Sequence, residues 1–117
     1  MRLFSYLSVF AFTLASPLAQ PADMEGYSTV LRVEFVLECM RDREGTVYEM
    51  MNKCSCAIDR LGQHYSAKEF VDAWTTSKAI TIAGERGAAL RDNKQAKQLA
   101  RAFRDSVKQA ETDCFLR

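Results

Sequence analysis

Proline and glycine are scarce in this sequence, with two prolines and five glycines among 117 residues, and no internal repeat or low-complexity tract is visible. An excess of one charge is also missing, since 16 Lys and Arg residues stand against 15 Asp and Glu residues. The resulting net charge of +1 argues against a protein whose first task is to bind bulk polyanion. With 48% hydrophobic residues and this length, the chain predicts one small globular domain and leaves no room for a second.

Long hydrophobic runs are absent beyond the N-terminal region, because charges interrupt every later apolar stretch. The N-terminal run extends from Leu3 to Leu14, directly after Arg2 and before a stretch of small residues. This order is typical of a secretory signal peptide, and the run is shorter than the ~20 apolar residues of a membrane-spanning helix. We predict a signal peptide at residues 1–19, cleaved after Ala15 or, by preference, after Ala19. We therefore expect a periplasmic or secreted protein whose mature chain has no transmembrane segment.

The predicted mature chain begins with a flexible arm at residues 20–26, which carries Pro21 and Gly26. Because Arg2 leaves with the signal peptide, 15 basic and 15 acidic residues remain, and the mature chain is formally neutral. In the predicted domain, residues 27–117, apolar residues recur at spacings of three and four, as in packed helices. We expect an all-α fold: a small antiparallel helical bundle of about four helices, cross-linked by two disulfides.

The predicted helices run over about 27–44, 47–63, 66–82 and 92–114. Gly45 ends the first, and Ser66 with Glu69 forms a capping-box pattern that opens the third. The second half of the third helix is rich in β-branched residues, but we keep it helical because a lone strand would have no partner. The stretch Gly84–Gly87 marks a loop, and Asp92 caps the last helix.

Each predicted helix has an apolar face that we expect to be buried. On the first helix this face comprises Val30, Val33, Leu37 and Met40, widened by Phe35 and Val36, and on the second Val47, Met51, Cys54, Ile58 and Leu61. On the third and last helices the corresponding residues are Phe70, Val71 and Trp74, and Ala96, Leu99, Phe103, Val107 and Ala110.

All four cysteines lie in the predicted domain, and an even number in an exported chain indicates two disulfides. Cys54 and Cys56 are two residues apart on one helix, so their side chains point about 200° apart and should not bridge each other. A hairpin about Gly45 brings Cys39 closer to Cys54 than to Cys56. We therefore prefer Cys39–Cys54 with Cys56–Cys114, and the alternative is Cys39–Cys56 with Cys54–Cys114.

A soft-metal site is the second interpretation of the same residues. Cys54 and Cys56, with Met50 and Met51 nearby in sequence, offer ligands that suit Cu(I). Disulfide formation would consume the thiolates, and methionines at helical spacing fit core positions. We predict no metal and no cofactor, and keep a periplasmic copper carrier as an alternative. The Cys-x-x-Cys-His pattern of covalent haem and the spacing of a thioredoxin-like site are absent.

Little in the sequence points to catalysis. His64 is the only histidine, and although Ser66 and Asp59 are near it in sequence, no nucleophile elbow surrounds them. The stretch Gly84–Gly87 with Arg91 lacks the spacing and the lysine of a phosphate loop, so a helix connection is favoured over an anion nest. We predict a protein that is not an enzyme.

Basic residues in the last predicted helix form the most specific surface feature. Their spacings of three and four place them within an arc of ~80°, away from the apolar side; they are Lys94, Lys97, Arg101, Arg104 and Lys108. Residues 23–49 hold three basic and seven acidic residues, whereas residues 91–117 hold seven basic and four acidic. We expect this face to dock an acidic protein partner or an anionic lipid surface, and an ordinary solvated face is the alternative. Nucleic acid is disfavoured by export and neutrality.

Two further patterns bear on function. The run from Cys39 to Asp42, the run from Lys53 to Asp59, the stretch Gly84–Gly87 and the terminal Cys114-Phe115 together resemble a group of small exported bacterial proteins of unassigned function. The general plan is also similar to periplasmic acid-stress chaperones of the HdeA kind, which are small, exported, helical and disulfide-linked. Those chaperones have a single disulfide, whereas this chain has four cysteines, enough for two disulfides. The resemblance adds a chaperone-like role as an alternative.

A small-ligand site between the helices, around Trp74 and Phe70, is the last alternative, because helical bundles host such sites. Aromatic residues at these spacings are more often simply core. We therefore expect an exported, non-enzymatic binding protein that acts through protein–protein contacts. No oligomeric state is predicted.

Overall fold

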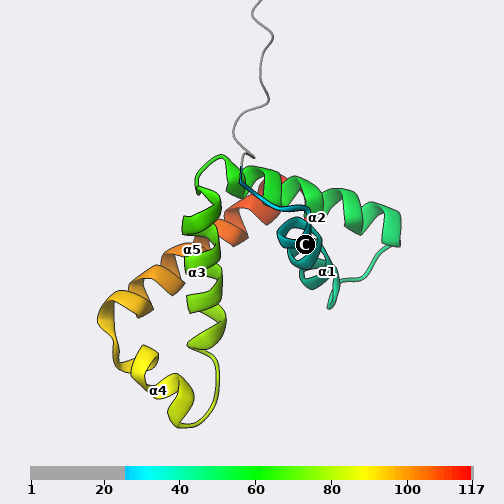
Figure 1. The fold of residues 1–117 in the computed structure, drawn as a ribbon. Helices are drawn as coiled ribbons and strands as arrows, with labels where there is room; N and C mark the ends of the chain where they lie inside the picture. Colours follow the sequence, from blue (N-terminus) through cyan, green and yellow to red (C-terminus); the bar gives the residue numbers. More distant parts are fainter. Residues whose placement is uncertain (1–25, 117) are drawn as a thin grey trace, which may run out of the picture.

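The structure is a computed structural model that describes residues 26–116, so the predicted signal peptide and most of the predicted arm lie outside the described residues. All regular structure in the described part is helical (Figure 1): α1 (Thr29–Met40), α2 (Val47–Gly62), α3 (Ala67–Ala79), α4 (Glu85–Asp92) and α5 (Lys94–Asp113). The predicted all-helical class and the presence of two disulfides are confirmed, but five helices are present instead of about four. Among these helices, none has the length and apolar character needed to cross a bilayer.

Side-chain caps fix the starts of four helices. The oxygen atoms of Ser28, Thr46, Ser66 and Asn93 each accept a hydrogen bond from a backbone N–H three residues on. The predicted capping box is confirmed, since the Glu69 carboxylate also accepts from the Ser66 backbone N–H, at 2.8 Å. These hydrogen bonds from Ser66 lower the pKa of Glu69. Short polar side chains thus satisfy donors that a helix start leaves without an intrahelical partner.

Several predicted helix ends are wrong. The first helix ends at Met40 rather than Glu44, and Gly45 follows in the connection with a φ of +141°. The third ends at Ala79, so its β-branched residues are helical only as far as Thr76. The last helix is capped by Asn93 rather than Asp92, because the Asn93 carboxamide oxygen is the atom that accepts from a backbone N–H, at 3.0 Å.

The stretch Gly84–Gly87 is not a plain loop, because α4 begins inside it. Gly84 is the N-cap of α4 and has a φ of +79°, whereas Gly87 is buried within the helix. The Arg91 guanidinium donates hydrogen bonds to the carbonyl oxygens of Ile82 and Gly84. A side chain on Gly87 would overlap the Ile82 carbonyl. Glycine at this position therefore lets the backbone at Ile82 pass close to α4.

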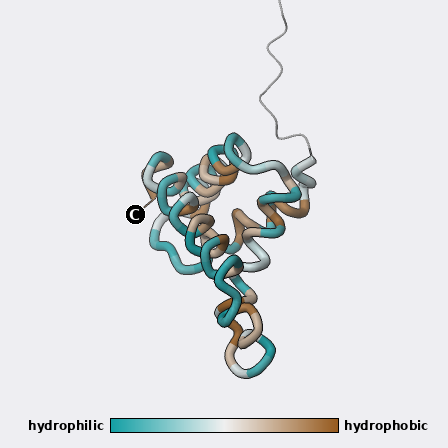
Figure 2. The backbone as a smooth tube through the Cα atoms, turned by 90° about the vertical axis from the view of Figure 1, so that its left-hand side faces the viewer, coloured by the Kyte–Doolittle hydropathy of each residue, from teal (hydrophilic) through white to brown (hydrophobic). Residues whose placement is uncertain are grey.

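The helices pack in pairs, α1 with α2, α3 with α5, and α2 with α5 (Figure 1). Helix α4 lies at the far end of α3 and α5. Hydrophilic and hydrophobic residues alternate along the helices (Figure 2). Phe70, which is fully buried, is central to the core: its ring lies 5.3–5.8 Å from those of Tyr27, Phe35, Trp74 and Phe103. Such tilted aromatic contacts add to the stabilisation from apolar burial.

The predicted inner face of α1 is wrong for three of its residues, whereas Val36 and Met40 pack against the core as expected. Val30, Val33 and Leu37 are 66%, 49% and 61% exposed, whereas Phe35 is buried and Cys39 packs against the core. At about 100° per residue, Val33 and Leu37 lie roughly 160° from Phe35, on the opposite side of the helix. The disulfide from Cys39 sets the rotation of α1 and therefore the side that is buried.

Four further residues predicted to be buried are exposed, one or two on each remaining long helix: Val47, Met51, Val71 and Leu99. Val47 is the first residue of α2, beyond the reach of the core. On α2 the buried methionine is Met50 rather than Met51. On α5, Ala100 is buried beside Phe103, whereas Leu99 faces outwards. The other predicted inner-face residues that the core buries are Cys54, Ile58, Leu61, Phe70, Phe103 and Ala110, as expected from the sequence.

The two disulfides join Cys39 to Cys54 and Cys56 to Cys114, the pairing preferred from the sequence. In each pair the Cα atoms are 5.9 Å apart, within the usual range. The first closes a separation of 15 residues and the second one of 58. In the chain-entropy picture these loops stabilise the fold by about 3 and about 4 kcal/mol. Two disulfides are also compatible with an oxidising, exported environment.

We predict that Gly87→Ala destabilises the protein. Alanine usually stabilises a helix by about 1 kcal/mol relative to glycine, but here its methyl group would overlap the Ile82 carbonyl. We expect the free energy of unfolding, measured in urea, to fall by about 1–3 kcal/mol. Ala89→Gly, at an exposed position of the same helix, measures helix propensity alone. A stability gain in Gly87→Ala would contradict the close contact.

A second prediction concerns Tyr27, which is 6% exposed and donates a hydrogen bond to the Tyr65 carbonyl oxygen at 2.9 Å. Burial, together with the nearby Glu69 carboxylate, raises the pKa of Tyr27 to about 12, from 10.0. The folded state therefore holds the phenol proton more tightly than the unfolded chain. Its stabilising contribution is complete below pH 10 and is lost as the pH rises from 10 to 12.

The measurement is the free energy of unfolding at several pH values in that range. We expect wild type to lose up to about 3 kcal/mol more than Tyr27→Phe, since each pKa unit corresponds to about 1.4 kcal/mol. The Tyr27→Phe variant has no phenol at this position and controls for all other groups that titrate. Equal losses in the two proteins would show that Tyr27 does not carry the effect.

Candidate functional site

The basic face comprises the five residues predicted from the sequence: Lys94, Lys97, Arg101, Arg104 and Lys108. The structure places all five on the exposed side of α5, which buries Ala100, Phe103 and Ala110 on its other side. At 1.5 Å per residue the row is ~21 Å long. Within residues 26–116, none of the five forms an ion pair with a carboxylate. Their positive charges therefore face solvent without a paired carboxylate, and the acidic residues of the same helix are Asp105, Glu111 and Asp113.

Five of the nine other cations in residues 26–116 pair with a carboxylate. Lys53 pairs with Glu49 along α2 at 2.7 Å, and Lys68 pairs with Asp72 along α3 at 2.6 Å. The hydrogen bond from Lys68 to Asp72 raises the pKa of that lysine. Both are i,i+4 pairs, which stabilise a helix modestly. The basic face thus differs in that all five of its cations lack such a pair, whereas about half of the other described cations have one.

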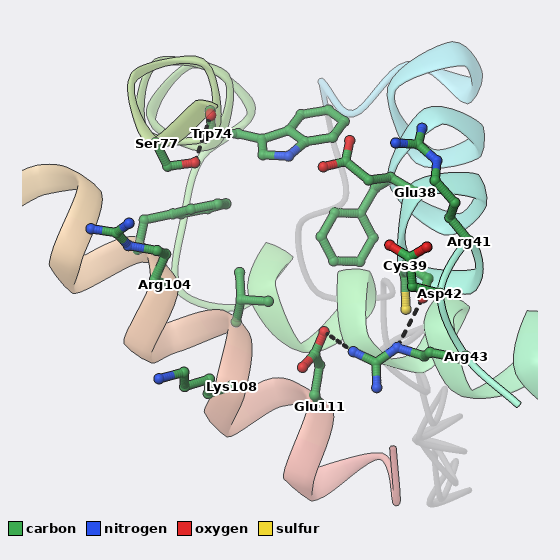
Figure 3. A pocket seen from close by; sticks show the side chains of 13 residues that line it. Glu38, Cys39, Arg41, Asp42, Arg43, Trp74, Ser77, Arg104, Lys108 and Glu111 are labelled. Carbon is green, nitrogen blue, oxygen red and sulfur yellow. Dashed lines mark hydrogen bonds and ion pairs between the residues drawn. The ribbon is translucent and has the colours of Figure 1, made fainter. Parts of the chain in front are cut away.

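A groove lies beside Trp74, between α1 and the α3–α5 pair (Figure 3). No Cα atom of α1 comes within 8 Å of one in α3 or α5, so side chains alone line the space between them. We call this the Trp74 groove; its volume is about 650 Å³. Its apolar lining consists of Phe35, Cys39, Trp74, Phe103 and Val107.

Charged side chains surround this apolar lining. Arg41, Arg43, Arg104 and Lys108 are the cations, and Glu38, Asp42 and Glu111 are the acids. Figure 3 shows Arg104 and Lys108 on the α5 side and Glu38 and Arg41 on the α1 side. Two members of the basic face, Arg104 and Lys108, therefore also line the groove.

Two ion pairs hold the ends of the groove. The Arg43 guanidinium binds the Glu111 carboxylate at 2.6 Å, with both side chains only 20% exposed, and also donates to the Cys39 carbonyl oxygen at 2.8 Å. Lys78 pairs with Glu38, which joins α3 to α1. The second pair links two helices whose backbones do not touch, and the first joins the connection after α1 to α5.

Trp74 forms one wall of the groove. The ammonium group of Lys78 lies 3.9 Å from the centroid of its ring, a cation–π contact. In Figure 3 the indole nitrogen is on the edge of the ring that faces the groove. Among the described residues, none accepts a hydrogen bond from this N–H. The groove thus presents one hydrogen-bond donor next to apolar rings.

The residues of the alternative metal site are not brought together as ligands. Cys54 and Cys56 are bonded to Cys39 and Cys114, so neither sulfur is a thiolate. Met50 is buried, whereas Met51 is exposed on another side of α2. Within residues 26–116, no three His, Cys, Asp or Glu side chains gather as they would around a metal ion. The oxidised structure therefore gives no support to the copper alternative.

The residues near His64 are not arranged as a catalytic group. The Ser66 hydroxyl caps α3 and donates to the Glu69 carboxylate at 2.7 Å. The Asp59 carboxylate lies 3.9 Å from Arg32. His64 itself is exposed in the turn after α2. Serine and aspartate thus have structural partners, and no histidine orients either of them.

Arg91, considered above for an anion nest, holds the turn before α4 through backbone carbonyl oxygens. Its guanidinium nevertheless lines a shallow hollow together with Asp92, Lys97, Arg101 and Arg104. The positive charge of the basic face therefore continues towards α4.

Of the two residues around which the sequence suggests a ligand site, Trp74 lines the groove, whereas Phe70 is fully buried and does not. Most of the groove lining is not apparent from the sequence. Its residues come from the end of α1, the connection after it, α3 and α5, and Arg43 and Glu111 are 68 positions apart. Spacing within a helix cannot reveal such pairs. The predicted pairing of Cys39 with Cys54 was the available signal, since it fixes the side of α1 that faces the groove.

Comparison of this chain with protein-family models, curated proteins and solved structures gives no match. The function of the protein must therefore be inferred from its own side chains.

Proposed function

We propose that this protein is an exported, non-enzymatic binding protein whose basic face docks an acidic protein surface. The observation that supports the proposal is the row of five exposed cations on α5, none of which has an ion-pair partner within residues 26–116. Like charges in a row repel one another, and a complementary row of carboxylates would remove this repulsion.

The rigidity of α5 favours docking. The helix packs along α3 and against α2, and the Cys56–Cys114 disulfide ties its C-terminal end to α2. Side chains on a fixed helix lose less freedom on binding than those on a mobile segment. The row is therefore preorganised for a partner with acidic groups at matching positions.

A protein surface fits these features better than a lipid bilayer. A helix that lies in a membrane interface inserts an apolar side between the lipids. The apolar side of α5 is occupied by the protein core, through Phe103 and Ala110. Only charge remains for contact with headgroups.

We predict that the double variant Lys97→Glu with Arg101→Glu no longer binds the partner. Both residues are exposed, so the melting temperature should stay within a few degrees of wild type. The purified protein is immobilised, exposed to the exported fraction of its source cells, and the retained proteins are identified by mass spectrometry. Poly-L-glutamate, a defined acidic polypeptide, should displace the retained acidic protein, and added salt should weaken the complex.

The matched control is Lys68→Glu with Arg60→Glu, which replaces one lysine and one arginine at exposed positions outside α5. It should retain the partner as wild type does. Retention of the same protein by the Lys97→Glu, Arg101→Glu variant would overturn the proposal. Binding to phosphatidylglycerol vesicles, with no acidic protein retained, would replace the protein partner by a lipid surface.

A further inference from the structure

The Trp74 groove has features of a ligand site that docking through the basic face does not use. Its volume of about 650 Å³ lies within the usual range for small-molecule sites. Three aromatic rings, those of Phe35, Trp74 and Phe103, line it from three different helices. Phe35 and Phe103 are only 5% and 2% exposed and form a buried floor. The partly exposed Trp74 and Val107 offer the apolar surface that a ligand body can cover, with a gain of free energy from burial.

The charges around the groove favour an anion. Glu111 is paired with Arg43, and Glu38 is paired with Lys78. Of the remaining lining residues, Arg41, Arg104 and Lys108 are positive and Asp42 is negative. Three positive charges against one leave an excess of +2 at the rim. Because Asp42 repels a second negative group, a ligand with a single acid group fits this rim best.

The hydrogen-bond donor inside the groove, the indole N–H of Trp74, also favours a ligand that carries an acid group. The indole N–H of Trp74 faces the groove and has no acceptor among residues 26–116 (Figure 3). The nearby Ser77 hydroxyl already donates to the Trp74 carbonyl oxygen at 2.7 Å. The free donor therefore suits a ligand that brings an oxygen acceptor. Arg104, with its planar guanidinium, is suited to a carboxylate.

We propose that the Trp74 groove binds a small amphipathic carboxylate, with its apolar body against Trp74 and Val107, above the floor of Phe35 and Phe103, and its acid group at Arg104 and Lys108. The proposal does not depend on docking of an acidic protein.

Decanoate is the probe for the test. Trp74 is the only tryptophan in the chain, so its fluorescence reports on the groove directly. We expect decanoate to shift and saturate the emission, and to bind at least about tenfold more tightly than decan-1-ol, which lacks the charge. Decylammonium, with the opposite charge, should bind more weakly still. Full-length mature protein is used, and calorimetry gives the dissociation constants.

The charge at the rim is tested with Arg104→Gln combined with Lys108→Gln. Both side chains are exposed, so folding should be preserved, and the melting temperature checks this. We expect decanoate affinity to fall by about tenfold or more, whereas decan-1-ol affinity should hardly change. The matched control, Arg60→Gln with Lys68→Gln, makes the same chemical changes away from the groove and should bind decanoate as wild type does.

The role of the indole N–H is tested with Trp74→Phe, which keeps an aromatic ring and removes the donor. Calorimetry should show weaker decanoate binding in this variant. Equal affinities for all three ten-carbon probes would mean that the groove selects for apolar surface only, and this would overturn the proposal. Absence of saturable decanoate binding would overturn it too. Neither result would affect partner capture through Lys97 and Arg101, which lie outside the groove lining.

Discussion

The two disulfides that leave α2 in different directions are the constraint on which the rest of the fold depends. Cys54 holds α1 and Cys56 holds the C-terminal end of α5, although the two cysteines are only two residues apart. A small domain gains limited stability from apolar burial alone, and covalent links supply part of the remainder. These links also fix geometry, because each sets the rotation of the helix that it joins to α2. The disulfides therefore determine which side of α1 is buried and hold the helix that carries the basic face.

How much the sequence could predict differs between local and long-range features. The row from Lys94 to Lys108 could be placed on one side of a helix because spacing alone determines this. The side of α1 that is buried could not, since that helix carries two apolar rows: Val30, Val33 and Leu37 on one side, and Leu31, Phe35 and Cys39 on the other. Periodicity fits both rows, and only the covalent partner of Cys39 selects between them.

Close contacts between backbone segments explain other differences between the sequence prediction and the structure. The stretch Gly84–Gly87 has the composition of a connection, but Gly87 serves a helix that passes close to the Ile82 carbonyl. A glycine required by a close contact looks the same in sequence as a glycine required by a turn. The Trp74 groove escaped prediction for a related reason: it exists where helices fail to touch, and ion pairs such as Arg43–Glu111 join distant segments.

Arg104 and Lys108 belong both to the basic face and to the rim of the Trp74 groove. Two occupants that use the same cations cannot be independent. An anion in the groove would neutralise part of the row seen by an acidic partner, and the partner would equally reduce the attraction of the groove for the anion. Thermodynamic linkage makes the two effects equal in free energy. A single helix would thus make the protein's hold on its partner responsive to the concentration of a small molecule.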